Sequence, residues 1–168
     1  MGNLLDMNPI ISATLQTLSK SRILIENLDD QILINASIGP YYSSIGSHLR
    51  HIFDFYHCII EGVKSNHVDL TCRKRDKEVE TSCLIALEYL ENIQRGLGNY
   101  PNILLKEVTV VDDLGLGKTE ISYTHASLLA QANSHAIHHY AIINYILHGL
   151  NVSISDLSFG YNPTTPSL

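Results

Sequence analysis

The histidines are the residues whose number and spacing in this sequence suit chemistry. The chain has nine of them in 168 residues. His135 and His139 are four positions apart, so on a helix they lie on one face, one turn from each other. Two imidazoles at that spacing are able to hold one metal ion. His48 and His51, three positions apart, share a helical face in the same way, and the two pairs together indicate a metal site.

Two observations limit what this pattern predicts. No Glu follows His135 in the sequence as it does in the HExxH pattern of zinc proteases, so that pattern's general base is missing. His138 is turned by about 100° from its neighbour His139 and does not share the ligand face. A histidine on an apolar helix also often only packs, so a structural bundle that serves as a dimer or partner scaffold stays open as an alternative.

Both histidine pairs fall in segments whose apolar periodicity predicts helices. Such helices are expected over residues 7–28, 43–63, 76–96 and 124–150. Residues 104–111 and 119–123 alternate in part, which is a weak hairpin signal. We therefore predict an all-α protein with a single domain over residues 1–168. It is expected to be a four-helix up-down bundle, with room for a short β-hairpin between the third and fourth helices.

The charge pattern argues against two kinds of partner. The formal net charge is −6, whereas non-specific binding to nucleic acid needs an excess of Lys and Arg. The charge run at 73–78 is interpreted as solvated surface. Residues 121–155 carry no charged side chain, which raises the question of a membrane span, but Gln131, Asn133 and several histidines make that segment too polar for lipid. We expect no nucleic-acid and no membrane partner.

The cysteine count and the N-terminal sequence predict a cytoplasmic location. Three cysteines, an odd and low number, do not suit a disulfide-stapled secreted domain and favour a reducing compartment. The N-terminal segment 1–6 has neither the basic region nor the apolar run of a signal peptide.

Three stretches of the sequence resemble a known family. They are SIGSHLRHIFD at 44–54, NSHAIHHYA at 133–141 and FGYNPTT at 159–165. With the segment at 73–76 they resemble the DinB/YfiT-like superfamily, and the resemblance extends from residue 43 to residue 166. It implies a four-helix bundle, often dimeric. It also implies a divalent metal held by three histidines, one on the second helix and two from the HxxxH pattern of the fourth.

The implied ligands carry over to this chain by matching residues. The fourth-helix ligands correspond to His135 and His139. The second-helix ligand corresponds to His51, which precedes the acidic Asp54 by three residues as the family's histidine precedes its acidic residue. His48 lies one turn earlier on the same face and is either a fourth ligand or the true third one. Asp54 is expected to orient a ligand histidine from outside the coordination sphere.

Such a site suits an enzyme, although binding without turnover is the alternative. Three neutral imidazoles leave an ion its full charge and at least one open position. Zn, Ni, Fe and Mn all accept imidazole, so the ligands do not select among them. The resemblance implies a metal-dependent thiol S-transferase or hydrolase, in which the ion activates a low-molecular-weight thiol or water toward a small-molecule substrate, in a homodimer. The alternative is a stress-associated helical module that binds a metal or small ligand without catalysis.

Overall fold

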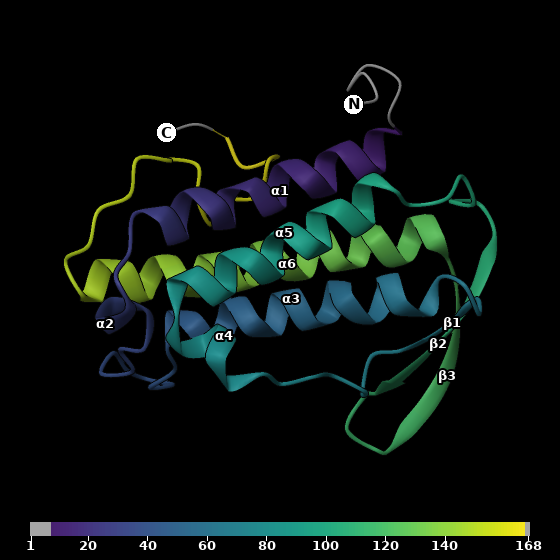
Figure 1. The fold of residues 1–168 in the computed structure, drawn as a ribbon, viewed down its shortest axis with the longest axis horizontal. Coiled ribbons are helices and arrows are strands. Elements are labelled where there is room, and N and C mark those ends of the chain that lie inside the picture. The colour runs from purple at the N-terminus through teal and green to yellow at the C-terminus, as the bar shows by residue number, and fades with distance from the viewer. Residues whose placement is uncertain (1–7, 167–168) are drawn as a thin grey trace.

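In the computed structural model, which describes residues 8–166, four long helices lie side by side and a small sheet closes one end (Figure 1). The elements follow in the order α1 (Pro9–Glu26), α2 (Asp30–Leu33), α3 (Ile45–Gly62), β1 (His67–Asp69), α4 (Lys77–Thr81), α5 (Cys83–Gly98), β2 (Glu107–Asp113), β3 (Lys118–Thr124) and α6 (His125–Gly149). The N-terminal segment 1–6, the expected helix start at Met7 and the last two residues of the expected domain lie outside the described residues.

The predicted all-α class is wrong. The described residues form six helices together with a three-stranded mixed sheet of order β1-β2-β3, so the protein is mostly helical but not a pure four-helix bundle. β1 pairs in parallel with β2, and β2 pairs antiparallel with β3. β1 has only three residues in a polar segment, too few to show the alternation that predicts a strand. Each of its residues pairs with a residue of β2 that lies 42 positions further along the chain, and this pairing determines the conformation of β1.

The order of helix directions also differs from the up-down prediction. α1 and α3 each pack against both α5 and α6. α3 and α5 run in the same direction, because the chain returns from β1 alongside α3 before it reaches α4 (Figure 1). The start of α5 therefore lies next to α2, where the Cys83 N–H donates to the Asp30 carboxylate at 2.7 Å. The expected single helix over 76–96 is two helices, because Ser82 has an extended backbone (φ −131°, ψ 121°) and caps α5.

Short polar side chains determine where the two histidine-bearing helices begin. The Ser44 hydroxyl accepts a hydrogen bond from the Ser47 N–H at the start of α3. Thr124 and Ser127 form a reciprocal capping box at the start of α6. Each such cap satisfies backbone donors that would otherwise have no partner, and contributes about 1 kcal/mol to helix stability.

The two helices are held by a continuous apolar core. Fully buried side chains from all four long helices meet in it, among them Leu18, Phe53, Leu90 and Ile143. Each contributes about 1.5–3 kcal/mol through burial, which makes the bundle a rigid support for side chains at its edge.

Gly46 allows α4 to lie directly on the first turn of α3. A Cβ at this position would collide with the backbone oxygen of Glu80. The close approach fixes α4 against the turn that precedes His48, so the start of α3 has little freedom to move.

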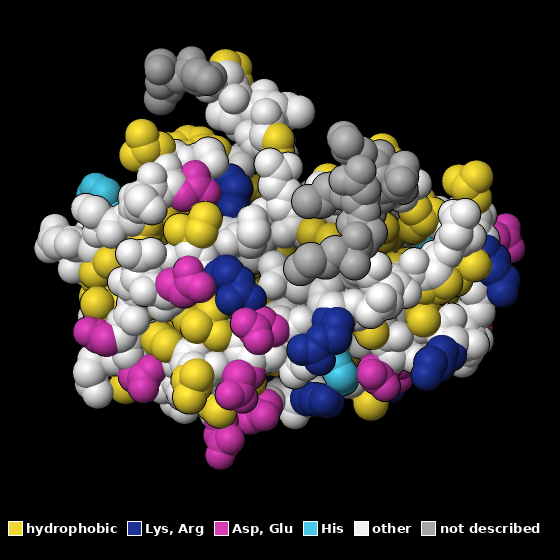
Figure 2. Space-filling view, turned by 45° about the horizontal axis from the view of Figure 1, so that its top comes forward, with side chains coloured by type: hydrophobic (Ala, Val, Ile, Leu, Met, Phe, Trp, Pro, Cys, Tyr) yellow, Lys and Arg dark blue, Asp and Glu magenta, His cyan; other side chains and the backbone are white. Residues whose placement is uncertain are grey.

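The surface carries charges of both signs. On the face that Figure 2 shows, several acidic and basic side chains lie next to each other, with hydrophobic and uncharged surface around them. Within residues 8–166, the structure has no helix whose length and apolar character would let it cross a membrane.

Candidate metal centre

The two histidine pairs face each other between α3 and α6. The ring centroid of His51 lies 4.9 Å from that of His135 and 4.7 Å from that of His139. The His135 and His139 centroids are 4.6 Å apart. Each of these three residues offers a ligand nitrogen within 4.8 Å of the other two. The fold therefore brings His51, His135 and His139 together into a group that is able to bind a metal ion.

The nitrogen separations fit an ion after a small adjustment. His51 Nε2 and His135 Nε2 are 2.8 Å apart, which is a hydrogen bond between two imidazoles. Two nitrogens bonded to one tetrahedral ion at 2.0–2.1 Å lie about 3.4 Å from each other. The two rings would have to separate by about 0.6 Å, which small side-chain rotations provide. Phe55 stacks on His135 with centroids 5.0 Å apart and supports that ring from behind.

His48 contacts the group through His139. His48 Nδ1 lies 2.9 Å from His139 Nδ1, and His48 Nε2 lies 2.8 Å from the Ser43 hydroxyl. Both ring nitrogens of His48 thus have hydrogen bonds, whereas His139 Nε2 has none among the described residues. The structure therefore brings His48 to the cluster, but outside the three histidines whose ligand atoms converge.

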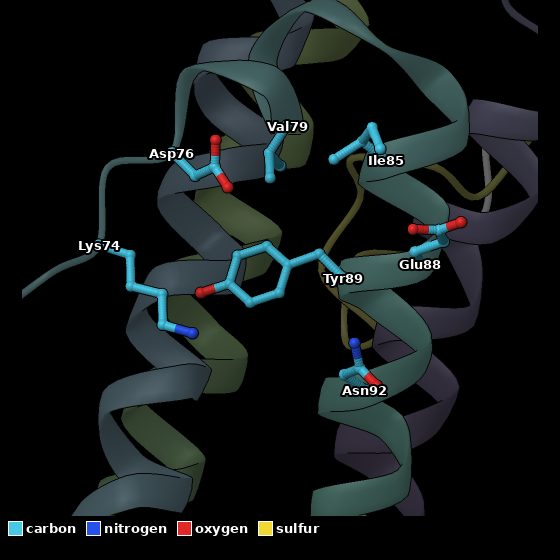
Figure 3. A pocket seen from close by; sticks show the side chains of 7 residues that line it. All are labelled: Lys74, Asp76, Val79, Ile85, Glu88, Tyr89 and Asn92. Carbon is cyan, nitrogen blue, oxygen red and sulfur yellow. The ribbon is translucent and has the colours of Figure 1, made fainter.

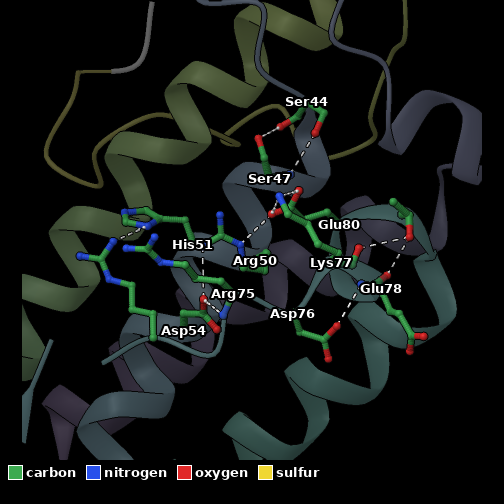
Figure 4. Close-up of polar contacts among 12 residues, drawn as sticks. Ser44, Ser47, Arg50, His51, Asp54, Arg75, Asp76, Lys77, Glu78 and Glu80 are labelled. Carbon is green, nitrogen blue, oxygen red and sulfur yellow. Dashed lines mark hydrogen bonds and ion pairs between the residues drawn. The ribbon is translucent and has the colours of Figure 1, made fainter. Parts of the chain in front are cut away.

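Asp54 is fully buried and its hydrogen bonds go elsewhere (Figure 4). Its carboxylate accepts from the Arg50 guanidinium at 3.2 Å, from the Tyr89 hydroxyl at 3.0 Å and from the Arg75 N–H at 3.1 Å. Among the residues described, none of the hydrogen bonds of Asp54 is to a candidate ligand histidine. Asp54 instead ties α3 to α5 and to residues 70–76, which we call the return segment.

Arg73, in the return segment, lies at the cluster although the sequence analysis did not single it out. Its Nη1 is 3.1 Å from His51 Nδ1, and its Nε donates to the Leu70 carbonyl at 2.8 Å. A guanidinium has only donors, so Arg73 donates and His51 Nδ1 accepts. The sequence signals at this position were the charge run at 73–78 and the segment at 73–76 in the family resemblance, and neither distinguishes one half-buried contact from a solvated surface.

Burial keeps the clustered histidines neutral. Burial, followed by the positive charge of Arg73, lowers the pKa of His51 to about 3. Burial and then the neighbouring His51 and His135 lower the pKa of His139 to about 2. Burial and Arg73 also lower the pKa of His135, and burial and His138 lower the pKa of His48. Since the neutral imidazole is the form that binds metals, protons do not compete for these nitrogens near neutral pH.

A cavity of about 170 Å³ lies apart from the histidines, between the return segment, α4 and α5 (Figure 3). Its wall includes Lys74, Glu88, Tyr89 and Asn92, and none of the clustered histidines. Tyr89 connects the cavity to the buried carboxylate of Asp54 through its hydroxyl. The cavity has polar groups of both charges and is large enough for a small ligand.

Neither a comparison with known protein families nor one with curated proteins found a match for this chain. The candidate metal centre therefore rests on the geometry and chemistry of the described residues.

Proposed function

We propose that the chain binds one divalent transition-metal ion through His51, His135 and His139, and that it is an enzyme of thiol S-transferase or hydrolase type. The observation that carries the proposal is the convergence of three neutral imidazoles from two helices within 4.8 Å. Membership of the DinB/YfiT-like superfamily is part of the proposal. It is supported by the agreement between the three ligands that the resemblance implies and the three histidines that converge. A homodimer and a cytoplasmic location are also part of it.

The residues next to His139 leave one of its ring nitrogens available to an ion. A divalent ion with three imidazole ligands keeps an open position and lowers the pKa of a water or thiol bound there toward neutrality. One arrangement of protons satisfies every hydrogen bond on the His139 side. In it, His139 Nδ1–H donates to His48 Nδ1, and His48 Nε2–H donates to Ser43. The lone pair of His139 Nε2 is then free for the ion, and His48 orients the ring.

Among residues 8–166, no cysteine thiolate lies beside the cluster. Cys58 follows His51 by two helical turns, but burial and then the nearby Asp54 raise the pKa of its thiol to about 11. Its Sγ lies 3.6 Å from the Cys72 carbonyl oxygen and donates to it. A protonated, buried thiol is a poor nucleophile. A nucleophile from solution, either water or a low-molecular-weight thiol, therefore suits this site better than a protein cysteine.

A binding module without turnover is the second candidate. The observation that favours it is the position of the 170 Å³ cavity, which the clustered histidines do not line. A ligand in that cavity would contact Lys74 and Glu88 rather than an ion between α3 and α6. On this hypothesis the ion would stabilise the bundle, and the cavity would bind the ligand.

Elemental analysis of the untagged protein tests the metal centre. The parent is compared with the His135→Ala/His139→Ala double variant and with His138→Ala, which removes an exposed neighbouring histidine. We expect about one ion per chain in the parent and in His138→Ala, and none in the double variant. Absence of metal from the parent after incubation with Zn, Ni and Mn would refute both metal-dependent hypotheses.

Turnover separates the two candidates once metal is found. The loaded protein is assayed with several low-molecular-weight thiols and a chromogenic electrophile, and with a chromogenic ester for hydrolysis. A rate that disappears in the double variant supports the enzyme. Bound metal without any rate above that of the double variant supports the binding module.

A further inference from the structure

Arg73 lies against the histidine cluster, and no carboxylate of the described residues pairs with it. Its side chain is half-buried, and among the described residues its hydrogen bonds go only to His51 Nδ1 and the Leu70 carbonyl. Arg50, by contrast, is neutralised by Asp54 at 3.2 Å and by Glu80 at 2.9 Å. A half-buried cation normally has a counter-ion, because removing charge from water is costly. Arg73 therefore has capacity to bind an anion that Arg50 does not have.

The contact between Arg73 and His51 is incompatible with metal binding. A neutral imidazole has one lone pair in the plane of its ring, and His51 uses it to accept from Arg73. If His51 binds an ion through Nε2, then Nδ1 carries the proton and two donors face each other. If His51 binds the ion through Nδ1, the ion takes the place of the guanidinium. In both cases the ion and Arg73 cannot share His51.

Two other hydrogen bonds keep Arg73 at the site after that contact is broken. The Arg73 Nε–H bond to Leu70 and the bond from the Arg75 N–H to the buried Asp54 hold the return segment on both sides of it. A small rotation of the planar guanidinium about the Cδ–Nε bond would turn Nη1 away from His51 and tilt the Nε–H bond to Leu70 with it. The guanidinium would then remain beside the cluster, with Nη donors that have no other partner among the described residues.

We propose that Arg73 is the anion-binding residue of the metal centre, released from His51 by the ion and then bound to an oxyanion of the ligand. The ligand class is a small molecule with a carboxylate or phosphate group next to a donor atom that occupies the open position on the ion. The planar guanidinium binds either oxyanion through two parallel hydrogen bonds. The inference rests on the proposed metal site and adds the class of ligand that this site selects.

The test uses the Co²⁺-loaded protein, whose visible absorption changes when a ligand enters the open position. Acetate and inorganic phosphate are the anionic probes, and neutral imidazole is the control ligand. In Arg73→Met we expect affinity for both anions to fall about tenfold or more, the effect of losing a hydrogen-bonded charge partner, with affinity for imidazole unchanged. Arg73→Lys keeps the positive charge but lacks the planar group that forms two parallel hydrogen bonds. Its affinity for the two anions should therefore lie between those of the parent and Arg73→Met.

Lys64→Met is the matched control. It removes the same charge from an exposed residue just after the end of α3, whose side chain has no hydrogen bond or ion pair among the described residues. Equal losses of anion affinity in Lys64→Met and Arg73→Met would overturn the inference, because net charge would explain both. Unchanged anion affinity in Arg73→Met and in Arg73→Lys would also overturn it, and the Lys variant guards against a folding defect in the Met variant.

A second measurement tests the incompatibility directly. In competition with a chromophoric chelator, Arg73→Met should bind Zn²⁺ about tenfold more tightly than the parent, because no hydrogen bond must be broken first. Weaker or equal Zn²⁺ affinity would contradict the release of Arg73 by the ion. A parent that binds no ion at all would refute the proposed function itself, whereas a parent that binds the ion but shows no role for Arg73 refutes only this inference.

Discussion

Replacing His48 by Phe tests whether His48 orients a metal ligand or is itself a metal ligand. The substitution keeps a ring of similar size and removes both nitrogens. It therefore deletes the 2.9 Å contact with His139 Nδ1 and the 2.8 Å contact with Ser43. His139 then loses the partner that keeps its proton on Nδ1 and its Nε2 lone pair free for an ion.

The expected loss is moderate. Removing the outer hydrogen-bond partner of a metal-binding histidine typically costs 10–100-fold in affinity, or about 1.4–2.8 kcal/mol. We expect the lower half of that range, because a bond between two neutral imidazoles contributes only about 0.5–1.5 kcal/mol. His51→Phe, by contrast, removes one of the three converging nitrogens and should abolish binding of one ion per chain.

The assay is competition between the protein and a chromophoric chelator for Zn²⁺, in parent, His48→Phe, His51→Phe and His138→Phe. The last variant removes an exposed histidine and is the control. Thermal unfolding with a chelator present shows whether each variant is folded. The reasoning is refuted if His48→Phe loses the ion as completely as His51→Phe, which would make His48 a ligand, or if it binds Zn²⁺ like the parent.

Three further predictions concern the stability of the metal-free protein. Asp54→Ala should lower the free energy of unfolding by about 3–5 kcal/mol in chemical denaturation, because it leaves buried donors unpaired; a loss below about 1 kcal/mol would contradict the structure. Gly46→Ala should destabilise by about 1–3 kcal/mol through overpacking against α4, whereas Gly98→Ala, with no atom within 4 Å of its Cβ, should not destabilise. Finally, the thermal midpoint should fall as the pH is lowered from 7 to 5. The pKa values of folded His51 and His139 are about 3 and 2, so only the unfolded chain takes up these protons below about pH 6.5, and the stability present above that pH is lost. A His51→Phe/His139→Phe variant should show a shallower fall, and an equal fall would refute this origin.

The sequence predicted the helices that carry the histidines because the signal is local. Apolar periodicity placed them at 43–63 and 124–150, and the structure has α3 at Ile45–Gly62 and α6 at His125–Gly149. β1 and the direction of α5 were not predictable in this way. Both depend on pairing with β2 and on the path of the return segment, which are contacts between residues far apart in the sequence.

The same distinction explains which parts of the site were predictable. The spacing of His135 and His139 is a local property of a helix, whereas the approach of Arg73 to His51 depends on the return segment passing alongside α3. Asp54 holds the return segment alongside α3, because its carboxylate accepts a hydrogen bond from the Arg75 N–H, two residues beyond Arg73. An acidic residue three positions after a candidate ligand histidine can therefore act on the histidine cluster without touching that histidine. It holds the segment that places Arg73 against His51, and only the fold reveals this role.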